Sequence, residues 1–161
     1  MTFAALYDRY AGDAYRFALY LSGDPALAED LAAETFARVW VVKDDVRIAT
    51  VKAYLFTIIR NLYLQGLRRQ SRMVPLEDVH EDRATSPEML AEARSELRAV
   101  LVALQQLPPL DRAALLMRAQ HQMPYEDIAA ALDVSLAAIK VRIHRARLKL
   151  AGARHPSEEP S

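Results

Sequence analysis

The chain has 161 residues, with 21 basic and 21 acidic side chains and hence a formal net charge of zero. It contains no cysteine, which excludes disulfides and thiolate metal sites, and its four histidines show no metal-ligand spacing. No apolar run approaches the length of a membrane span, so we expect no membrane insertion. Abundant Ala, Leu and Arg with only four glycines favour an all-α protein, and because the chain has no glycine-rich phosphate loop we expect no cofactor.

The charge is unevenly distributed along the chain. Residues 60–72 hold four arginines and no acid, residues 73–106 are mainly acidic, and residues 134–155 are basic again. Salt screening limits the reach of the acidic stretch to about 10 Å, so each basic patch can still attract a polyanion locally. A net charge of zero therefore does not exclude nucleic-acid binding.

Apolar periodicity predicts three helices in the first 72 residues. The first ends near Ser22, and Asp24 is expected to cap a second helix that begins at Pro25 and runs to about Val42. A third covers about 50–71. The inward side chains predicted for the second and third helices are Ala28, Leu31, Ala32, Thr35, Phe36, Val39, Trp40, Tyr54, Leu55, Ile58, Leu62 and Leu67.

A second group of helices follows an acidic break in the periodicity. We interpret residues 73–86 as a flexible linker between two small domains, and we expect the two domains to move independently about it. A fourth helix is predicted over about 87–106, and the adjacent Pro108 and Pro109 end it. Asp111 is expected to cap a fifth helix over about 111–121. The polar tail, 155–161, is expected to be disordered.

Residues 124–150 predict a helix-turn-helix. The first short helix places Ile128 and Leu132 on one face, Asp133 is a residue type that tolerates a left-handed turn, and Ser135 stands at an N-cap position. The apolar stripe of the second helix is Ile139, Ile143, Ala146 and Leu150. This layout is typical of a motif whose second helix enters a DNA major groove.

The remaining faces of that second helix carry a row of basic side chains, namely Lys140, Arg142, His144, Arg145, Arg147 and Lys149. A plain solvated surface is the alternative interpretation, because basic residues near a helix C-terminus also complement its dipole. Solvated faces usually mix both signs of charge, however, and residues 134–156 contain no acid. The pattern therefore favours DNA binding over a plain surface helix.

Four segments, in this order, resemble the bacterial RNA polymerase sigma factors of the extracytoplasmic-function (ECF) type, which belong to the sigma-70 family. They are 22–31 with Glu34-Thr35-Phe36 and Trp40; 53–62; Leu107-Pro108 with Arg112; and 125–129 with 139–147. The resemblance spans about residues 3–152. It implies a non-enzymatic transcription initiation factor of the bacterial cytoplasm, monomeric when free, that directs core RNA polymerase to promoters.

The same resemblance implies a role for each domain. Residues 1–72 would bind polymerase and melt the −10 element, and residues 87–154 would read the −35 element. The implied contacts with the polymerase β′ clamp helices are Asp30, Glu34, Phe36, Arg38 and Trp40. The implied −10 contacts are Lys52, Arg60, Asn61, Arg68 and Arg69. The implied −35 contacts are Ser135, Ala137, Ala138, Lys140, Val141, Arg142, His144, Arg145, Arg147 and Lys149.

Within these sets, Lys140, His144 and Arg145 are assigned to base edges and Arg142, Arg147 and Lys149 to phosphates. Tyr54, Tyr63 and Trp40 are expected to be structural rather than base-stacking residues. The other implied partners are the polymerase β flap, promoter DNA and an anti-sigma factor.

The chain departs from the family pattern at Ala33, Gln65 and Asp133, where the family usually has Gln, Asp and Gly. Its recognition helix also begins with apolar residues, Leu136 to Ala138, which shifts readout toward thymine methyls and DNA shape. Two alternatives remain open. One is a sigma mimic that titrates an anti-sigma factor, and the other is a helix-turn-helix repressor, which predicts a stable dimer.

Overall fold

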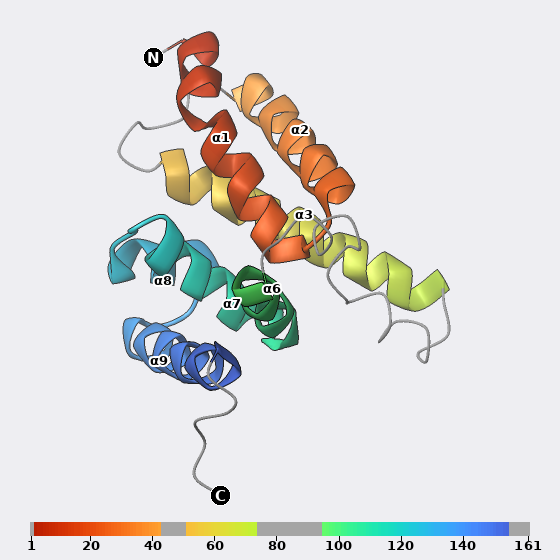
Figure 1. Cartoon of the computed structure of the whole chain (residues 1–161). Helices are drawn as coiled ribbons and strands as arrows, with labels where there is room; N and C mark the ends of the chain where they lie inside the picture. Colours follow the sequence, from red (N-terminus) through yellow and green to blue (C-terminus); the bar gives the residue numbers. More distant parts are fainter. Residues whose placement is uncertain (1, 43–50, 74–94, 155–161) are drawn as a thin grey trace, which may run out of the picture.

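The computed structural model describes residues 2–42, 51–73 and 95–154, and over these ranges it contains helices and no strand, which confirms the all-α prediction. The elements in chain order are α1 (Phe3–Ser22), α2 (Pro25–Val42), α3 (Val51–Met73), α6 (Ser95–Gln106), α7 (Pro109–Leu115), the π-helical turn η3 (Leu116–Gln120), α8 (Tyr125–Leu132) and α9 (Leu136–Arg154). Figure 1 shows α1–α3 at one end, α9 at the other, and α6–α8 between them.

The predicted segments 74–86, 87–94 and 155–161 lie outside the described residues. Within the described ranges, no helix combines the length and the apolar character that crossing a membrane requires.

The corner between α1 and α2 forms as the sequence predicts. Gly23 adopts a left-handed conformation, with φ of 71°, and its N–H donates to the carbonyl of Leu19, which closes the last turn of α1. The Asp24 carboxylate accepts a hydrogen bond of 3.0 Å from the N–H of Ala26 and thereby caps α2, which begins at Pro25.

The buried face of α3 is rotated from the predicted one. Val51, Leu55, Phe56, Ile59 and Tyr63 are buried, whereas Tyr54 is 38% exposed, so its predicted core role is wrong. The difference arises because α3 packs on α1 and α2 and also on α8 of the second half. The periodicity of one helix does not reveal which neighbours it has.

The prediction that Trp40 lies in the core is also wrong, because its side chain is 52% exposed. It lies near the end of α2 and packs edge-on against Phe3, with ring centroids 4.8 Å apart. Phe36, one turn earlier, is only 5% exposed. At the C-terminal end of α2, Phe36 is therefore buried, whereas Trp40 contacts Phe3 and leaves half of its surface exposed.

The start of α7 differs from the prediction as well. The helix begins at Pro109, with Pro108 in the cap position, and Asp111 makes no capping bond. Proline suits this first position because its missing N–H would be unpaired there anyway. Asp111 instead lies buried in the first turn, where its carboxylate pairs with Arg142.

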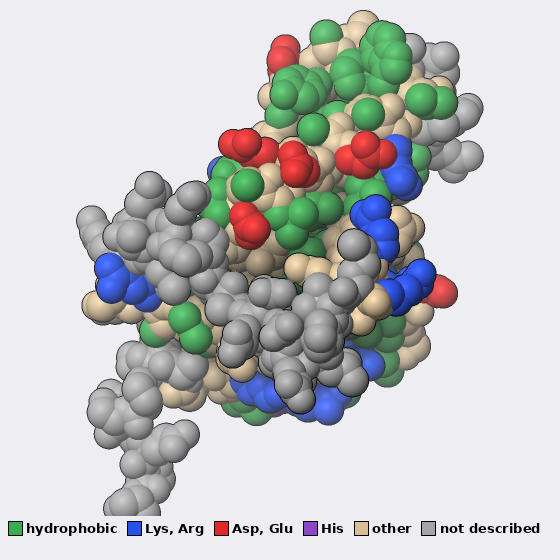
Figure 2. Space-filling model, turned by 90° about the vertical axis from the view of Figure 1, so that its right-hand side faces the viewer, with side chains coloured by type: hydrophobic (Ala, Val, Ile, Leu, Met, Phe, Trp, Pro, Cys, Tyr) green, Lys and Arg blue, Asp and Glu red, His purple; other side chains and the backbone are tan. Residues whose placement is uncertain are grey.

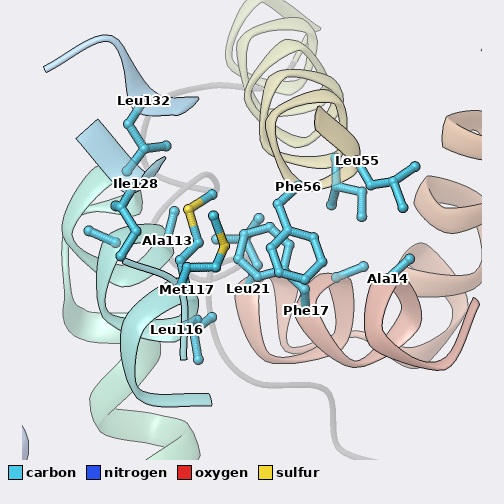
Figure 3. Packing of buried hydrophobic residues seen from close by; sticks show 14 of the residues in the cluster. Ala14, Phe17, Leu21, Leu55, Phe56, Ala113, Leu116, Met117, Ile128 and Leu132 are labelled. Atoms are coloured by element: carbon cyan, nitrogen blue, oxygen red, sulfur yellow. The ribbon is translucent and has the colours of Figure 1, made fainter. Parts of the chain in front are cut away.

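The two halves share one hydrophobic core, whereas the sequence led us to expect independent domains. Phe17 of α1 stacks on Phe56 of α3, with ring centroids 4.3 Å apart, and His121 meets Phe56 edge-on at 4.6 Å. Figure 3 shows Phe17 and Phe56 beside Met117 and, farther away, Ile128 of the second half. The linker composition gives no sign of these complementary faces, because they form only when both halves are folded.

Candidate nucleic-acid interface

The two helices of the predicted helix-turn-helix, α8 and α9, meet at the expected turn. Asp133 has φ of 55° and ψ of 49°, the left-handed conformation inferred from its residue type. The Ser135 hydroxyl accepts a hydrogen bond of 3.1 Å from the N–H of Ala138 and caps α9. Ile139 and Ile143 of α9 are fully buried, so the stripe expected to face inward does so.

The outward side of α9 presents a row of exposed side chains. The exposed members of the predicted −35 set are Ser135, Ala137, Lys140, Val141, His144, Arg145, Arg147 and Lys149. None of the five basic side chains among them pairs with an acid within the described ranges. Ala138 is half-buried. This face offers a polyanion several cations whose charges are not neutralised.

Arg142 differs from its prediction. Its Nη1 lies 2.7 Å from Oδ1 of Asp111, whose side chain is 12% exposed. The pair ties α9 to α7, because position 142 lies on the flank of α9 that faces that helix. Arg142 therefore makes a structural contact within the second half, which no local pattern predicts because its partner lies 31 residues away.

Tyr125, at the start of α8, is a second feature that was not assigned a role from the sequence. Its half-buried ring lies beneath the guanidinium of Arg118 at 4.2 Å, and the ammonium of Lys140 is 5.8 Å from the ring centroid. A cation over an aromatic face is attracted by the ring quadrupole. The ring therefore attracts the Lys140 ammonium toward the start of α8, near the first turn of α9.

On α3, the predicted −10 residues fall into two groups. Lys52 is half-buried and its Nζ lies 3.6 Å from Oδ2 of Asp13 on α1. Arg60 is half-buried too, and within the described ranges its Nε has no hydrogen-bond partner. Burial, with the repulsion of Arg68, lowers the pKa of Arg60 below its ordinary value. Asn61, Arg68 and Arg69 are exposed.

The exposed arginines line a groove between α2 and the last turns of α3, with a volume of about 1050 Å³. The charged side chains on the α2 wall are Asp24, Asp30, Glu34 and Arg38, and those on the α3 wall are Arg68, Arg69 and Arg72. Figure 2 shows acidic side chains close together on the upper part of one face, with most basic side chains below them. The groove therefore has walls of unlike charge.

The predicted polymerase-binding set is only partly on the surface. Asp30, Glu34 and Arg38 are exposed, and Arg38 Nε lies 3.3 Å from Oε1 of Glu34. Trp40 is exposed as well, although the sequence placed it in the core. Phe36 is buried against Phe3 and Tyr7, so it does not reach a partner and instead supports the α2 surface from below.

Within the described ranges, no three His, Asp or Glu side chains come close enough to hold a metal ion. The surfaces with distinct chemistry in these ranges are thus the basic face of α9 and the charged groove between α2 and α3.

Comparison with known proteins matches both halves of the chain to families. Residues 6–73 match the model of sigma-70 region 2, and residues 97–150 match that of sigma-70 region 4. The ECF RNA polymerase sigma factor SigL of Mycobacterium tuberculosis is 34% identical, over 88% of this chain and 82% of its own length. SigM of Bacillus subtilis is 29% identical, over 93% of both chains.

SigE of Mycolicibacterium smegmatis is 35% identical over 93% of this chain, which spans 61% of the length of that relative. Among solved structures, a co-crystal structure of the sigma factor RpoE in complex with the anti-sigma factor NepR from Bartonella quintana has 26% identity. It superposes with a TM-score of 0.78 over 98% of both chains, so the similarity includes both halves and their packing.

Proposed function

This chain belongs to the ECF RNA polymerase sigma factors, which are transcription initiation factors, and we propose that its two halves divide promoter recognition between them. The C-terminal domain, residues 87–154, reads the −35 element with α9. The N-terminal domain, residues 1–72, binds core polymerase through α2 and holds the melted −10 element on α3. The observation that carries the proposal is the exposed basic face of α9, placed on a helix-turn-helix with the expected turn and cap.

The −35 assignment rests on which α9 side chains are exposed. Lys140, His144 and Arg145 reach outward from the first half of the helix and can donate to base edges in a major groove. Arg147 and Lys149 follow on the same exposed side and suit phosphates. Val141 is 54% exposed and offers an apolar contact to a thymine methyl.

The N-terminal assignment rests on the charged groove and its surroundings. Asp30, Glu34 and the exposed ring of Trp40 form a mixed acidic and apolar surface on α2, which suits docking on the β′ clamp helices. Arg68 and Arg69 on the opposite wall suit the phosphates of a separated strand, which needs a positive track.

The comparisons also support two further proposals, namely that an anti-sigma factor regulates this chain and that the chain acts in a bacterium. The structural relative was crystallised with its anti-sigma factor, and we propose that this chain too is held by an anti-sigma protein. We further propose that it is monomeric when free, acts in the bacterial cytoplasm, contacts the β flap with its C-terminal domain and catalyses no reaction of its own.

The direct test combines the purified chain with bacterial core RNA polymerase, followed by gel filtration and run-off transcription from a promoter library. We expect co-elution and specific transcripts. Lys140→Ala/Arg145→Ala should keep co-elution and lose the transcripts, whereas Asp30→Ala/Glu34→Ala should lose both. Co-elution of the wild type without any transcript would indicate a decoy for an anti-sigma factor, and a stable dimer on a palindromic DNA would indicate a repressor.

A further inference from the structure

The first two turns of the recognition helix α9 offer few hydrogen-bond donors to DNA. In residues 136–143, only Lys140 and Arg142 carry side chains that can donate a hydrogen bond. Arg142 is half-buried, and its Nη1 is held 2.7 Å from Oδ1 of Asp111. Recognition helices contact base edges mainly with their N-terminal residues. Hydrogen-bonded readout by this part of α9 therefore depends on Lys140.

A lysine in this position needs help to distinguish one base from another. Its ammonium is a compact charge on a flexible stem, whereas arginine presents a rigid fork that matches the edge of guanine. The lysine stem loses rotamer entropy whenever the ammonium is fixed on one base. An interaction that restrains the side chain before DNA binds reduces this cost, and it does so only for a base in the matching place.

The ring of Tyr125, at the start of α8, is the group that can restrain Lys140. The Lys140 ammonium lies 5.8 Å from the ring centroid, within the range of a cation–π contact. Glu126 and Asp127 follow in the same turn of α8, but no ion pair joins either carboxylate to Lys140 within the described ranges. A carboxylate would neutralise the ammonium, whereas a ring face attracts it and leaves its three N–H donors for DNA.

The Tyr125 ring is itself held in place by contacts within the second half. The Arg118 guanidinium lies 4.2 Å from the ring centroid, and its Nη1 donates to the carbonyl of Met123 at 3.0 Å. Met123 is buried, and the half-buried ring packs against the hydrophobic core. Lys140, in contrast, is exposed and has a flexible stem. The ring is therefore the fixed member of the pair and the lysine the restrained one.

We propose that Tyr125 is a positioning residue for base readout, whose ring restrains the Lys140 ammonium so that Lys140 discriminates among bases at one position of the −35 element. The proposal rests on the proposed function, because it deepens the assignment of Lys140 to base edges. Removing the ring should reduce discrimination at that position by about two- to fivefold, which corresponds to the strength of an exposed cation–π contact.

The test measures binding to a −35 duplex, and to duplexes substituted one base pair at a time, by fluorescence anisotropy at one salt concentration. Lys140→Ala identifies the base position that depends on the lysine. Tyr125→Leu should lose discrimination at that position and keep it at the position that depends on Arg145. In the Lys140→Ala background, Tyr125→Leu should have no further effect, because both changes remove the same interaction.

Tyr125→Phe is the matched control, because it keeps the ring face and removes only the hydroxyl. It should discriminate among bases as the wild type does. An equal loss of affinity on every duplex in Tyr125→Leu and Tyr125→Phe would make the tyrosine a backbone contact. Additive effects of Tyr125→Leu and Lys140→Ala would show that the two residues act independently. Either result would overturn the positioning role.

A second measurement follows the contact without DNA. The chain has four lysines, so methylation with ¹³C-formaldehyde gives few NMR signals, and Lys140→Arg identifies the signal of Lys140. The Tyr125 ring current should shift this signal in the wild type and in Tyr125→Phe, and the shift should be lost in Tyr125→Leu. An unshifted wild-type signal would overturn the restraint.

Failure of the proposed function gives a different result from failure of the positioning role. If the wild type binds every duplex equally, the proposed function fails, and the readout role of the ring fails with it. If the wild type is specific and Tyr125→Leu keeps full discrimination at the Lys140 position, only the role of Tyr125 is overturned.

Discussion

The two helices assigned to DNA, α3 and α9, carry similar numbers of basic residues but present them differently. In α9 a single stripe is buried, including Ile139 and Ile143, and all but one of its predicted basic contacts are exposed. In α3 the buried face is wider because helices of both halves pack on it, and Lys52 and Arg60 are half-covered. Basic residues in sequence are therefore not equally available to a nucleic acid.

The difference teaches that the basic side chains of α9 are exposed for the contact with duplex DNA that we propose, whereas Lys52 and Arg60 of α3 are partly covered in the folded chain. α9 lies at the end of the molecule, away from α1–α3 (Figure 1). α3 lies at the junction, where Thr57 and Tyr63 bond to the second half. The two proposed DNA-binding surfaces thus differ in how far the packing of the two halves covers them.

The largest effect we expect is a loss of folding stability at acidic pH, caused by His121, which packs against Phe56 of α3. Burial lowers the pKa of His121 to about 4, although the nearby Asp13 opposes this shift, whereas an unfolded histidine titrates near 6.5. Between these values the unfolded chain binds a proton that the folded chain does not. Stability is therefore full above about pH 6.5 and falls as the pH drops toward 4. The loss should be about 2–3 kcal/mol between about pH 7 and about pH 4.5.

Urea unfolding at both pH values measures this loss, with His121→Gln as the control because glutamine has no charge to gain. The variant should lose correspondingly less stability than the wild type over the same interval. An equal loss in both proteins would show that protonation of His121 does not cause the fall in the free energy of unfolding at acidic pH.

The next effect concerns base readout by α9. Arg145→Ala should cost about 1–3 kcal/mol of binding to a −35 duplex, and the loss should depend on the base at one position. Arg60→Ala on α3 is the matched control, and it should leave binding to the same duplex unchanged. Fluorescence anisotropy with duplexes substituted one base pair at a time checks both. A loss that is the same on every duplex would make Arg145 a phosphate contact.

The third effect separates Arg142 from its neighbours on α9. Arg142→Gln leaves the Asp111 carboxylate buried without its charged partner, so the free energy of unfolding should fall by about 1–2 kcal/mol. DNA binding at a temperature where the variant is folded should keep its dependence on salt. Chemical denaturation and a salt titration test the two parts, and a reduced salt slope would return Arg142 to the phosphate-binding set.

The smallest effect concerns Lys149. Lys149→Ala should weaken binding to all DNA sequences by less than about 1 kcal/mol and lower the salt slope by about one, because one phosphate contact is lost. Its thermal unfolding should match that of the wild type, since the side chain is exposed. A sequence-dependent loss would instead assign Lys149 to base edges.

Local signals predicted much of this architecture correctly. Asp24 caps α2, Asp133 takes the left-handed turn, and Ser135 caps α9. Each of these features depends on bonds within a few residues, so residue type and position suffice to predict it. Tyr63, expected to be structural, is indeed buried at the junction.

Most of the predictions that differed depended on distant neighbours. Tyr54 and Trp40 proved exposed because the faces of α3 and α2 are chosen by the helices packed on them. Phe36 is too buried to meet polymerase, and Arg142 pairs with a carboxylate from another helix.

By itself, the sequence determined the helices, the caps at Asp24 and Ser135, the helix-turn-helix and the family, because these follow from local hydrogen bonding, periodicity and motif order. Only the tertiary structure decided that the halves pack together, with Arg112 donating to the Leu21 carbonyl, and which basic residues stay exposed. Those outcomes depend on contacts between segments far apart in the chain, such as Leu21 and Arg112, which no local pattern specifies.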